Sequence, residues 1–158
     1  MLYLSVVKVI LNSEQETRAL GQKCGQLLRG GEVIELIGDI GAGKTTFTKG
    51  IAEGMGVTDT IQSPTFTISR VYDAPSGIEL CHYDFYRLSD AGIMADELHE
   101  ASNNPHSVVI IEWGDIVREV LPQDYVEVHF SAISESVREL EFSANGIRST
   151  ELVKEMAP

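Results

Sequence analysis

The stretch Gly38-Asp39-Ile40-Gly41-Ala42-Gly43-Lys44-Thr45 matches the phosphate-binding loop pattern G-x-x-x-x-G-K-[S/T] at every defined position. The mostly apolar residues 33–37 ahead of it predict a buried strand, and residues 45–55 behind it predict a helix. Strand, loop and helix therefore follow in the order that such a loop requires. The alternative, an ordinary glycine-rich turn, needs neither the Lys-Thr pair nor both flanks, so we expect the stretch to bind a nucleotide.

The loop combines the kinds of group that bind phosphate. Its glycines let the backbone turn tightly enough for successive N–H groups to face phosphate oxygens, and the following helix adds the positive end of its dipole. Lys44 would reach the β- and γ-phosphates, and the Thr45 hydroxyl would bind Mg²⁺. These features predict a nucleotide bound together with a magnesium ion.

Composition limits the size of the fold and its partners. The chain has 158 residues, of which 43% are hydrophobic and 23% are charged, which suits one globular domain with a sizeable core. Its net charge of −12 opposes the phosphate backbone of nucleic acids, and its 12 basic residues are spread along the chain. We therefore expect any nucleic acid substrate to reach this protein through a partner.

Two cysteines and the N-terminal stretch indicate a compartment. Cys24 and Cys81 lack CxxC spacing and lie in helix-like and strand-like segments, which favours reduced, buried thiols and a cytoplasmic protein. Residues 1–11 lack a basic segment and a cleavage site, so we expect a strand there and no signal peptide. No apolar run reaches about 18 residues, so we expect no membrane span.

A helix is predicted to begin at Ser13, because Ser13-Glu14-Gln15-Glu16 has the capping-box pattern. Gly21 and Gly25 in this helix would let a neighbouring element approach closely. The remaining elements are predicted from shorter stretches: hairpins at 66–84 and 126–142, helices at 90–99 and 115–120, and a strand buried on both faces at 107–111.

Residues 146–158 show no convincing period, and we expect this tail to fray. The sequence therefore predicts a single domain over residues 1–158 of the α/β class. It resembles a phosphate-loop NTPase, with a mainly parallel sheet flanked by helices and antiparallel hairpins added to it.

Two acidic residues are candidates for holding Mg²⁺. Glu112 ends the most hydrophobic strand of the chain, and Asp84 ends the strand-like stretch before it. Ligands in open α/β sheets collect at the carboxyl ends of the strands, so both residues are expected near the phosphate loop. The alternative for each is a strand-end carboxylate in solvent.

A hydroxyl-rich, kinked segment, Ser63-Pro64-Thr65, follows the helix of the phosphate loop. Other phosphate-loop proteins place a segment that senses the γ-phosphate at this point, whereas a tight turn is the plainer interpretation. Trp113, the one tryptophan, is a packing residue by default, although Glu112 beside it would place it near a nucleotide.

In combination, the motifs resemble the TsaE (YjeE) family of small bacterial ATPases. The motifs that carry the resemblance are Gly38–Thr46, Ser63-Pro64-Thr65-Phe66-Thr67, His82-Tyr83-Asp84-Phe85-Tyr86-Arg87-Leu88 and Ile111-Glu112-Trp113. The resemblance implies a Mg²⁺-dependent ATPase, weak without its partners, that supports formation of threonylcarbamoyladenosine next to the anticodon of tRNA. It implies the transferase pair TsaD and TsaB as partners and tRNA only through them, with no role for DNA or a membrane.

The resemblance also implies residue roles. Thr45 and Glu112 would bind Mg²⁺, Asp84 would bind it or orient the attacking water, and Thr65 would belong to a loop near the γ-phosphate. Lys44 would act on the phosphates. The remaining ATP contacts would come from the loop and from two more distant residues: Asp39, Ile40, Gly41, Ala42, Gly43, Thr46, Glu14 and Arg138.

Three rival functions share parts of this pattern. A small-molecule or nucleotide kinase needs several basic residues around the transferred phosphoryl group, and the arginines that follow the loop are scattered. A GTP switch would need an Asn-Lys-x-Asp stretch, which the sequence lacks. A structural subunit that holds ATP without hydrolysing it is compatible with the sequence.

Overall fold

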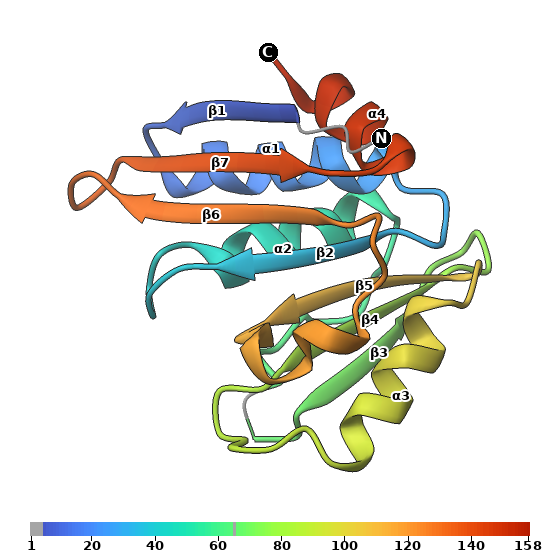
Figure 1. Cartoon of the computed structure of the whole chain (residues 1–158). Coiled ribbons are helices and arrows are strands. Elements are labelled where there is room, and N and C mark those ends of the chain that lie inside the picture. Colours follow the sequence, from blue (N-terminus) through green and yellow to red (C-terminus); the bar gives the residue numbers. More distant parts are fainter. Residues whose placement is uncertain (1–4, 65) are drawn as a thin grey trace.

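The computed structural model describes residues 5–64 and 66–158, and it contains a seven-stranded sheet with the strand order β1-β7-β6-β2-β5-β4-β3 (Figure 1). The strands are β1 (Ser5–Leu11), β2 (Val33–Ile37), β3 (Ser69–Asp73), β4 (Glu79–Asp84), β5 (Ser107–Glu112), β6 (Val126–Ala132) and β7 (Arg138–Ala144). The helices are α1 (Glu14–Leu27), α2 (Lys44–Gly54), α3 (Ile93–Ser102), the 3₁₀ helix η1 (Gly114–Val120) and α4 (Ile147–Met156).

The centre of the sheet is parallel and both edges are antiparallel. Strands β6, β2, β5 and β4 run parallel to one another. The hairpin partners β3 and β7 and the first strand β1 add antiparallel pairs at the two edges. Both predicted hairpins and the α/β class are confirmed, and the sheet as a whole is mixed around a parallel core.

Helices cover both faces of the sheet. Figure 1 shows α1 and α2 behind it and α3 in front, and the buried residues form one cluster on each side. Along β5, Val108 and Ile110 belong to the first cluster, whereas Val109 and Ile111 belong to the second. This alternation explains why the strand is an unbroken apolar run, as predicted for a strand buried on both faces.

Helices α1 and α2 cross at an unusually short distance because glycines line both of them. A Cβ added to Gly21 would overlap the carbonyl oxygen of Phe47, and one added to Gly25 would overlap that of Ile51. The reverse also holds, since a Cβ on Gly50 would overlap the carbonyl of Arg18. The close approach predicted for Gly21 and Gly25 is therefore confirmed, and the neighbour is the helix that follows the phosphate loop.

The C-terminal tail corrects one expectation. Residues 146–158 were expected to fray, but 147–156 form helix α4, whose Val153 and Met156 are buried. The carboxylate of Asp124 accepts hydrogen bonds from the backbone N–H groups of Arg148 (3.1 Å) and Ser149 (3.0 Å). The helix therefore has an N-terminal cap supplied from a distant part of the chain.

Other boundaries shift by a few residues. Helix α3 spans 93–102 rather than 90–99, and β3 begins at Ser69 rather than at Phe66. The late start of β3 has a local cause, because the N–H groups of Thr67 (3.1 Å) and Ile68 (2.5 Å) both donate to the carbonyl of Pro64. In the capping box, Glu16 accepts from the N–H of Asn12 (2.6 Å), one residue before the expected partner, Ser13.

Every helix within residues 5–64 and 66–158 is too short or too polar to cross a membrane.

The close crossing of α1 and α2 predicts that an alanine at Gly50 destabilises the protein. Alanine favours an exposed helix over glycine by about 1 kcal/mol, so helix propensity alone predicts that Gly50→Ala stabilises the protein. Overlap with the Arg18 carbonyl predicts the opposite, a loss of about 1–3 kcal/mol in the free energy of unfolding. Urea denaturation measures the difference, with Gln26→Ala, which truncates an exposed side chain of α1, as control. A stabilised Gly50→Ala would contradict the close crossing.

Candidate functional site

The phosphate loop lies between the carboxyl end of β2 and the start of α2, as predicted. Gly41 (φ +81°) and Gly43 (φ +109°) have left-handed backbone conformations that a residue with a Cβ rarely adopts. A Cβ on Gly41 would meet no atom within 4 Å, so the loop faces open space there. Within the described part of the chain, no side chain caps the start of α2, which leaves its first N–H groups available to an anion.

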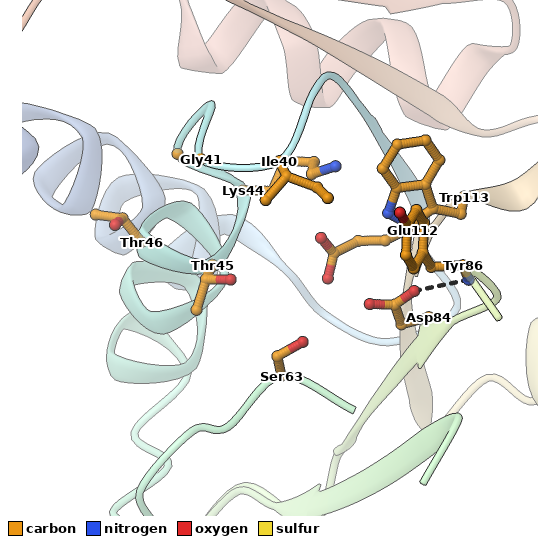
Figure 2. Close-up of a pocket in the computed structure, with 11 residues that line it drawn as sticks. Ile40, Gly41, Lys44, Thr45, Thr46, Ser63, Asp84, Tyr86, Glu112 and Trp113 are labelled. Carbon is orange, nitrogen blue, oxygen red and sulfur yellow. Dashed lines mark hydrogen bonds between the residues drawn. The ribbon is translucent and has the colours of Figure 1, made fainter. Parts of the chain in front are cut away.

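The two predicted acids lie side by side. Asp84 and Glu112 are direct neighbours in the register of the parallel strands β4 and β5, and each residue is 4% exposed. Figure 2 shows both carboxylates turned toward the side of Thr45 and Ser63. The expectation that strand-end acids gather beside the loop is therefore met by the geometry, which also excludes two carboxylates free in solvent.

Hydrogen bonds hold both acids in place. Asp84 Oδ1 accepts from the N–H of Tyr86 at 2.9 Å (Figure 2). His82, buried in β4, lies with its Nε2 2.7 Å from Glu112 Oε2, where a ring N–H donates to a carboxylate. His82 therefore orients Glu112, a role that the sequence did not suggest for this histidine.

These residues surround a cavity of about 300 Å³. Its lining combines the loop, the start of α2 and the ends of β4 and β5: Ile40, Gly41, Gly43, Lys44, Thr45, Thr46, Ser63, Asp84, Tyr86, Glu112 and Trp113. Ser63 belongs to the predicted hydroxyl-rich segment, whereas Thr65 falls outside the described residues. Tyr86 was missed by sequence reasoning, although its position two residues after Asp84 could have indicated it.

Lys44 is buried between the loop and Trp113. Its Nζ donates to the carbonyl oxygen of Gly38 at 2.5 Å and lies 4.4 Å from the centre of the Trp113 ring. Burial lowers the pKa of Lys44, and the negative charges of Glu112, Asp84 and Asp39 oppose that shift. A positive charge in this partly desolvated place attracts phosphate more strongly than the same charge on the surface.

Trp113 packs against the second core cluster and also lines the cavity. Its backbone has the left-handed conformation (φ 57°, ψ 48°), and its ring packs against that of Tyr86 with centroids 4.9 Å apart. The indole thus forms part of the cavity wall beside Glu112 and above Lys44. The interpretation of this tryptophan as a packing residue is therefore incomplete, because its ring also forms a wall of the cavity.

A second cavity, of about 530 Å³, lies on the other side of the loop. It shares Gly41, Gly43 and Thr46 with the first and adds residues from α1 and from the β6–β7 hairpin: Glu14, Thr17, Glu135, Ser136 and Arg138. Glu14 accepts a hydrogen bond from the Thr46 hydroxyl at 3.2 Å. Arg138 donates to the carbonyls of Ser134 (2.8 Å) and Gly41 (3.5 Å).

The predicted contact residues divide between the two cavities. Glu14 and Arg138 come from distant elements, and both line the second cavity. Asp39 and Ala42 are absent from the described lining of both cavities; the Ala42 N–H donates to the Asp39 carbonyl at 3.1 Å. These two residues shape the loop by a turn and place no side chain in either cavity.

The donor set suits Mg²⁺ only if a nucleotide completes it. Over the described residues, no three His, Cys, Asp or Glu side chains gather closely enough to hold a metal by themselves. Asp84, Glu112 and the Thr45 hydroxyl supply hard oxygen ligands in one cavity. Mg²⁺ prefers six oxygen ligands and keeps water and phosphate oxygens among them, so this set fits a metal that arrives with phosphate.

Comparisons with known proteins agree with one another. The family model described as "Threonylcarbamoyl adenosine biosynthesis protein TsaE" matches residues 11–140. A tRNA threonylcarbamoyladenosine biosynthesis protein TsaE from Bacillus subtilis (strain 168) is 37% identical over 145 residues, covering 90% of this chain and 89% of that protein. The same-named protein of Streptomyces coelicolor is 42% identical over 108 residues, which cover 68% of this chain and 73% of that one.

A solved structure is similar as well. The crystal structure of YdiB from Bacillus subtilis superimposes with a TM-score of 0.80 at 33% sequence identity, covering 98% of this chain and 95% of that one. The mixed sheet with its parallel core is therefore a fold already seen in a related protein.

Removing the loop lysine should weaken nucleotide binding. We expect Lys44→Ala to lower the affinity for ATP at least tenfold, because a hydrogen bond to a charged group contributes about 1.5–3 kcal/mol and the backbone N–H groups would act alone. Calorimetric titration measures the affinity of each variant for ATP. Lys49→Ala is the control, since Lys49 is on the same helix and is absent from the described lining of both cavities. Equal affinities for wild type and Lys44→Ala would remove Lys44 from the site.

Proposed function

Because this chain belongs to the TsaE family, whose members are named for tRNA threonylcarbamoyladenosine biosynthesis, we propose that it binds ATP with Mg²⁺ and hydrolyses it in support of that modification. The observation that carries the proposal is the register of Asp84 beside Glu112, both buried and facing the phosphate loop. An ATPase needs this combination of anion cradle and paired acids, whereas a glycine-rich turn with no ligand does not.

The residues take the following roles in this proposal. Backbone N–H groups of residues 43–46 and the Lys44 ammonium would bind the phosphates, and Thr45, Asp84 and Glu112 would hold Mg²⁺. When bound, Mg²⁺ neutralises charge on the phosphate oxygens and fixes their orientation. Asp84 alternatively orients the attacking water, because its Oδ1 is fixed by the Tyr86 N–H.

The second cavity would hold the nucleoside. Glu14 can accept from hydroxyl or amino groups, and Arg138 can donate to ribose or phosphate oxygens, so both suit the base and ribose side of ATP. Thr65 would contribute to the loop near the γ-phosphate, as the resemblance implies. Asp39, Ile40 and Ala42 would act through the backbone and the shape of the loop.

The partners are the TsaD and TsaB transferase pair, with tRNA reached only through them. The net charge of −12 supports an indirect contact with tRNA, because a surface of this charge repels the phosphate backbone. Buried, free Cys24 and Cys81 support a reducing, cytoplasmic location. Neither DNA nor a membrane has a part in this proposal.

The rival functions make different demands on the arginines. A kinase would gather them around the transferred phosphoryl group. Here Arg118 pairs with Glu35 at 2.8 Å, Arg148 lies 3.5 Å from Glu32, and Arg87 stacks on Phe66 at 4.5 Å. The non-hydrolysing subunit differs from the ATPase in one outcome, the release of phosphate.

We expect Asp84→Asn and Glu112→Gln to lose hydrolysis while ATP binding changes little. The cradle supplies most phosphate contacts, whereas the acids act on charge that develops in the transition state, and loss of one such stabiliser typically costs on the order of 10² to 10³ in rate. Phosphate release is measured with the TsaD–TsaB pair present, since activity without partners is expected to be weak.

The matched control is Asp73→Asn, a strand-end acid that is exposed and absent from the described lining of both cavities. If either acid variant hydrolyses ATP at the wild-type rate, that residue has no part in hydrolysis and the role proposed for it is wrong. If wild type binds ATP but releases no phosphate with the partner pair, the protein is the non-hydrolysing subunit.

A further inference from the structure

A buried carboxylate lies outside the proposed ATP site. Glu35 is in the middle of β2, is 0% exposed, and neighbours Ile111 on one side and Glu127 on the other. Its Oε1 accepts from Arg118 at 2.8 Å, whereas Oε2 has no hydrogen-bond partner among residues 5–64 and 66–158. Burying a half-satisfied carboxylate in a central strand costs free energy, so its presence calls for a role other than stability.

Arg118 ties the helix η1 to the sheet through several carboxylates at once. Its Nη2 also donates to Asp115 at 3.1 Å, and its Nη1 donates to Glu127 at 3.3 Å. Burial raises the pKa of Glu35, and the positive charge of Arg118 opposes this rise. Carboxylates from β2, β6 and η1 itself thus meet on one guanidinium, which suits an arginine fork better than a lysine.

The position of this helix determines the position of Trp113. It stands immediately before η1 in a left-handed conformation, which costs a non-glycine residue on the order of 1–3 kcal/mol and persists only where neighbours fix it. A Cβ on the next residue, Gly114, would lie 3.1 Å from Glu35 Oε2, so the carboxylate packs directly against this turn. Val117, 1% exposed, fixes the same helix from its apolar side.

We propose that the Glu35–Arg118 ion pair is a positioning device that holds the turn at Trp113, so that the indole stays against Lys44 and closes one wall of the phosphate cavity. Both residues are absent from the described lining of the two cavities, so they act through Trp113. The consequence for ATP binding rests on the proposed function, whereas the position of Trp113 can be measured without nucleotide.

The test uses the fluorescence of the one tryptophan in the 158-residue chain without nucleotide. In Arg118→Met and Glu35→Gln, the emission of Trp113 should shift to longer wavelength, and its acrylamide quenching constant should rise about twofold or more. Arg118→Lys, which keeps the charge but not the fork, should fall between these variants and wild type. Circular dichroism at the same temperature establishes that each variant is folded. An ion pair that only stabilises the fold would change the melting temperature but leave the emission and quenching of Trp113 as in wild type.

Arg148→Met is the matched control. Arg148 pairs with Glu32 and donates to the Gly30 carbonyl, just before the start of β2 and away from the phosphate loop. It should leave the emission of Trp113 unchanged. Wild-type emission and quenching in folded Arg118→Met and Glu35→Gln would overturn the proposal. If Arg118→Met does not fold, Arg118→Lys and Glu35→Gln, which preserve side-chain size, decide the question by the same readout.

An ATP titration separates this inference from the proposed function. Where Trp113 has moved, we expect ATP affinity to fall severalfold relative to wild type and to Arg148→Met. If wild type itself does not bind ATP, the proposed function fails. The nucleotide-free spectra still show whether the Glu35–Arg118 ion pair positions Trp113. If Trp113 moves and ATP affinity is unchanged, the indole is not a wall that the nucleotide requires, and the proposal is wrong in that part.

Discussion

The parallel pairing of β4 with β5 is the constraint on which the site depends. It places Asp84 directly beside Glu112, and burial leaves each only 4% exposed. Two carboxylates so close repel each other in a medium that screens poorly, so the arrangement favours a nearby positive charge. Lys44 supplies part of that charge, and a divalent cation arriving with phosphate would supply the rest. Loop and acids are therefore two halves of one electrostatic arrangement.

The helices determine where the loop can be. Glycines at 21, 25 and 50 let α1 lie against α2 at backbone contact distance, and this brings Glu14 to the Thr46 hydroxyl. The second cavity exists because the start of α1, the loop and the β6–β7 hairpin converge there. Trp113, the residue before η1, lies with the centre of its ring 4.4 Å from Lys44 Nζ. Each side of the proposed ATP site is thus built by a different packing interaction.

Much of this could be predicted from the sequence because the signals are local. The loop has a spaced motif, residues 107–111 are apolar without interruption, and both acids end strands whose carboxyl ends must share an edge. The features that were missed depend on distant partners. Helix α4 is capped by Asp124, and Glu35 pairs with Arg118, 83 residues away. In the sequence, Glu35 is merely one charge in an apolar strand, and the left-handed turn at Trp113 has no signature of its own.

Joint binding of metal and nucleotide would show most directly that the loop and the acids form one site. Mn²⁺ replaces Mg²⁺ on oxygen ligands and is observed by electron paramagnetic resonance, so its binding can be titrated with and without a non-hydrolysable ATP analogue. We expect the protein to bind Mn²⁺ tightly only when the analogue is present, and the spectrum of the Mn²⁺–analogue complex to change when the protein is added, because no three acidic, His or Cys side chains gather to hold the ion within the described residues. Mn²⁺ that binds the protein equally well without the analogue, or a spectrum of Mn²⁺ with the analogue that is unchanged by the protein, would contradict it.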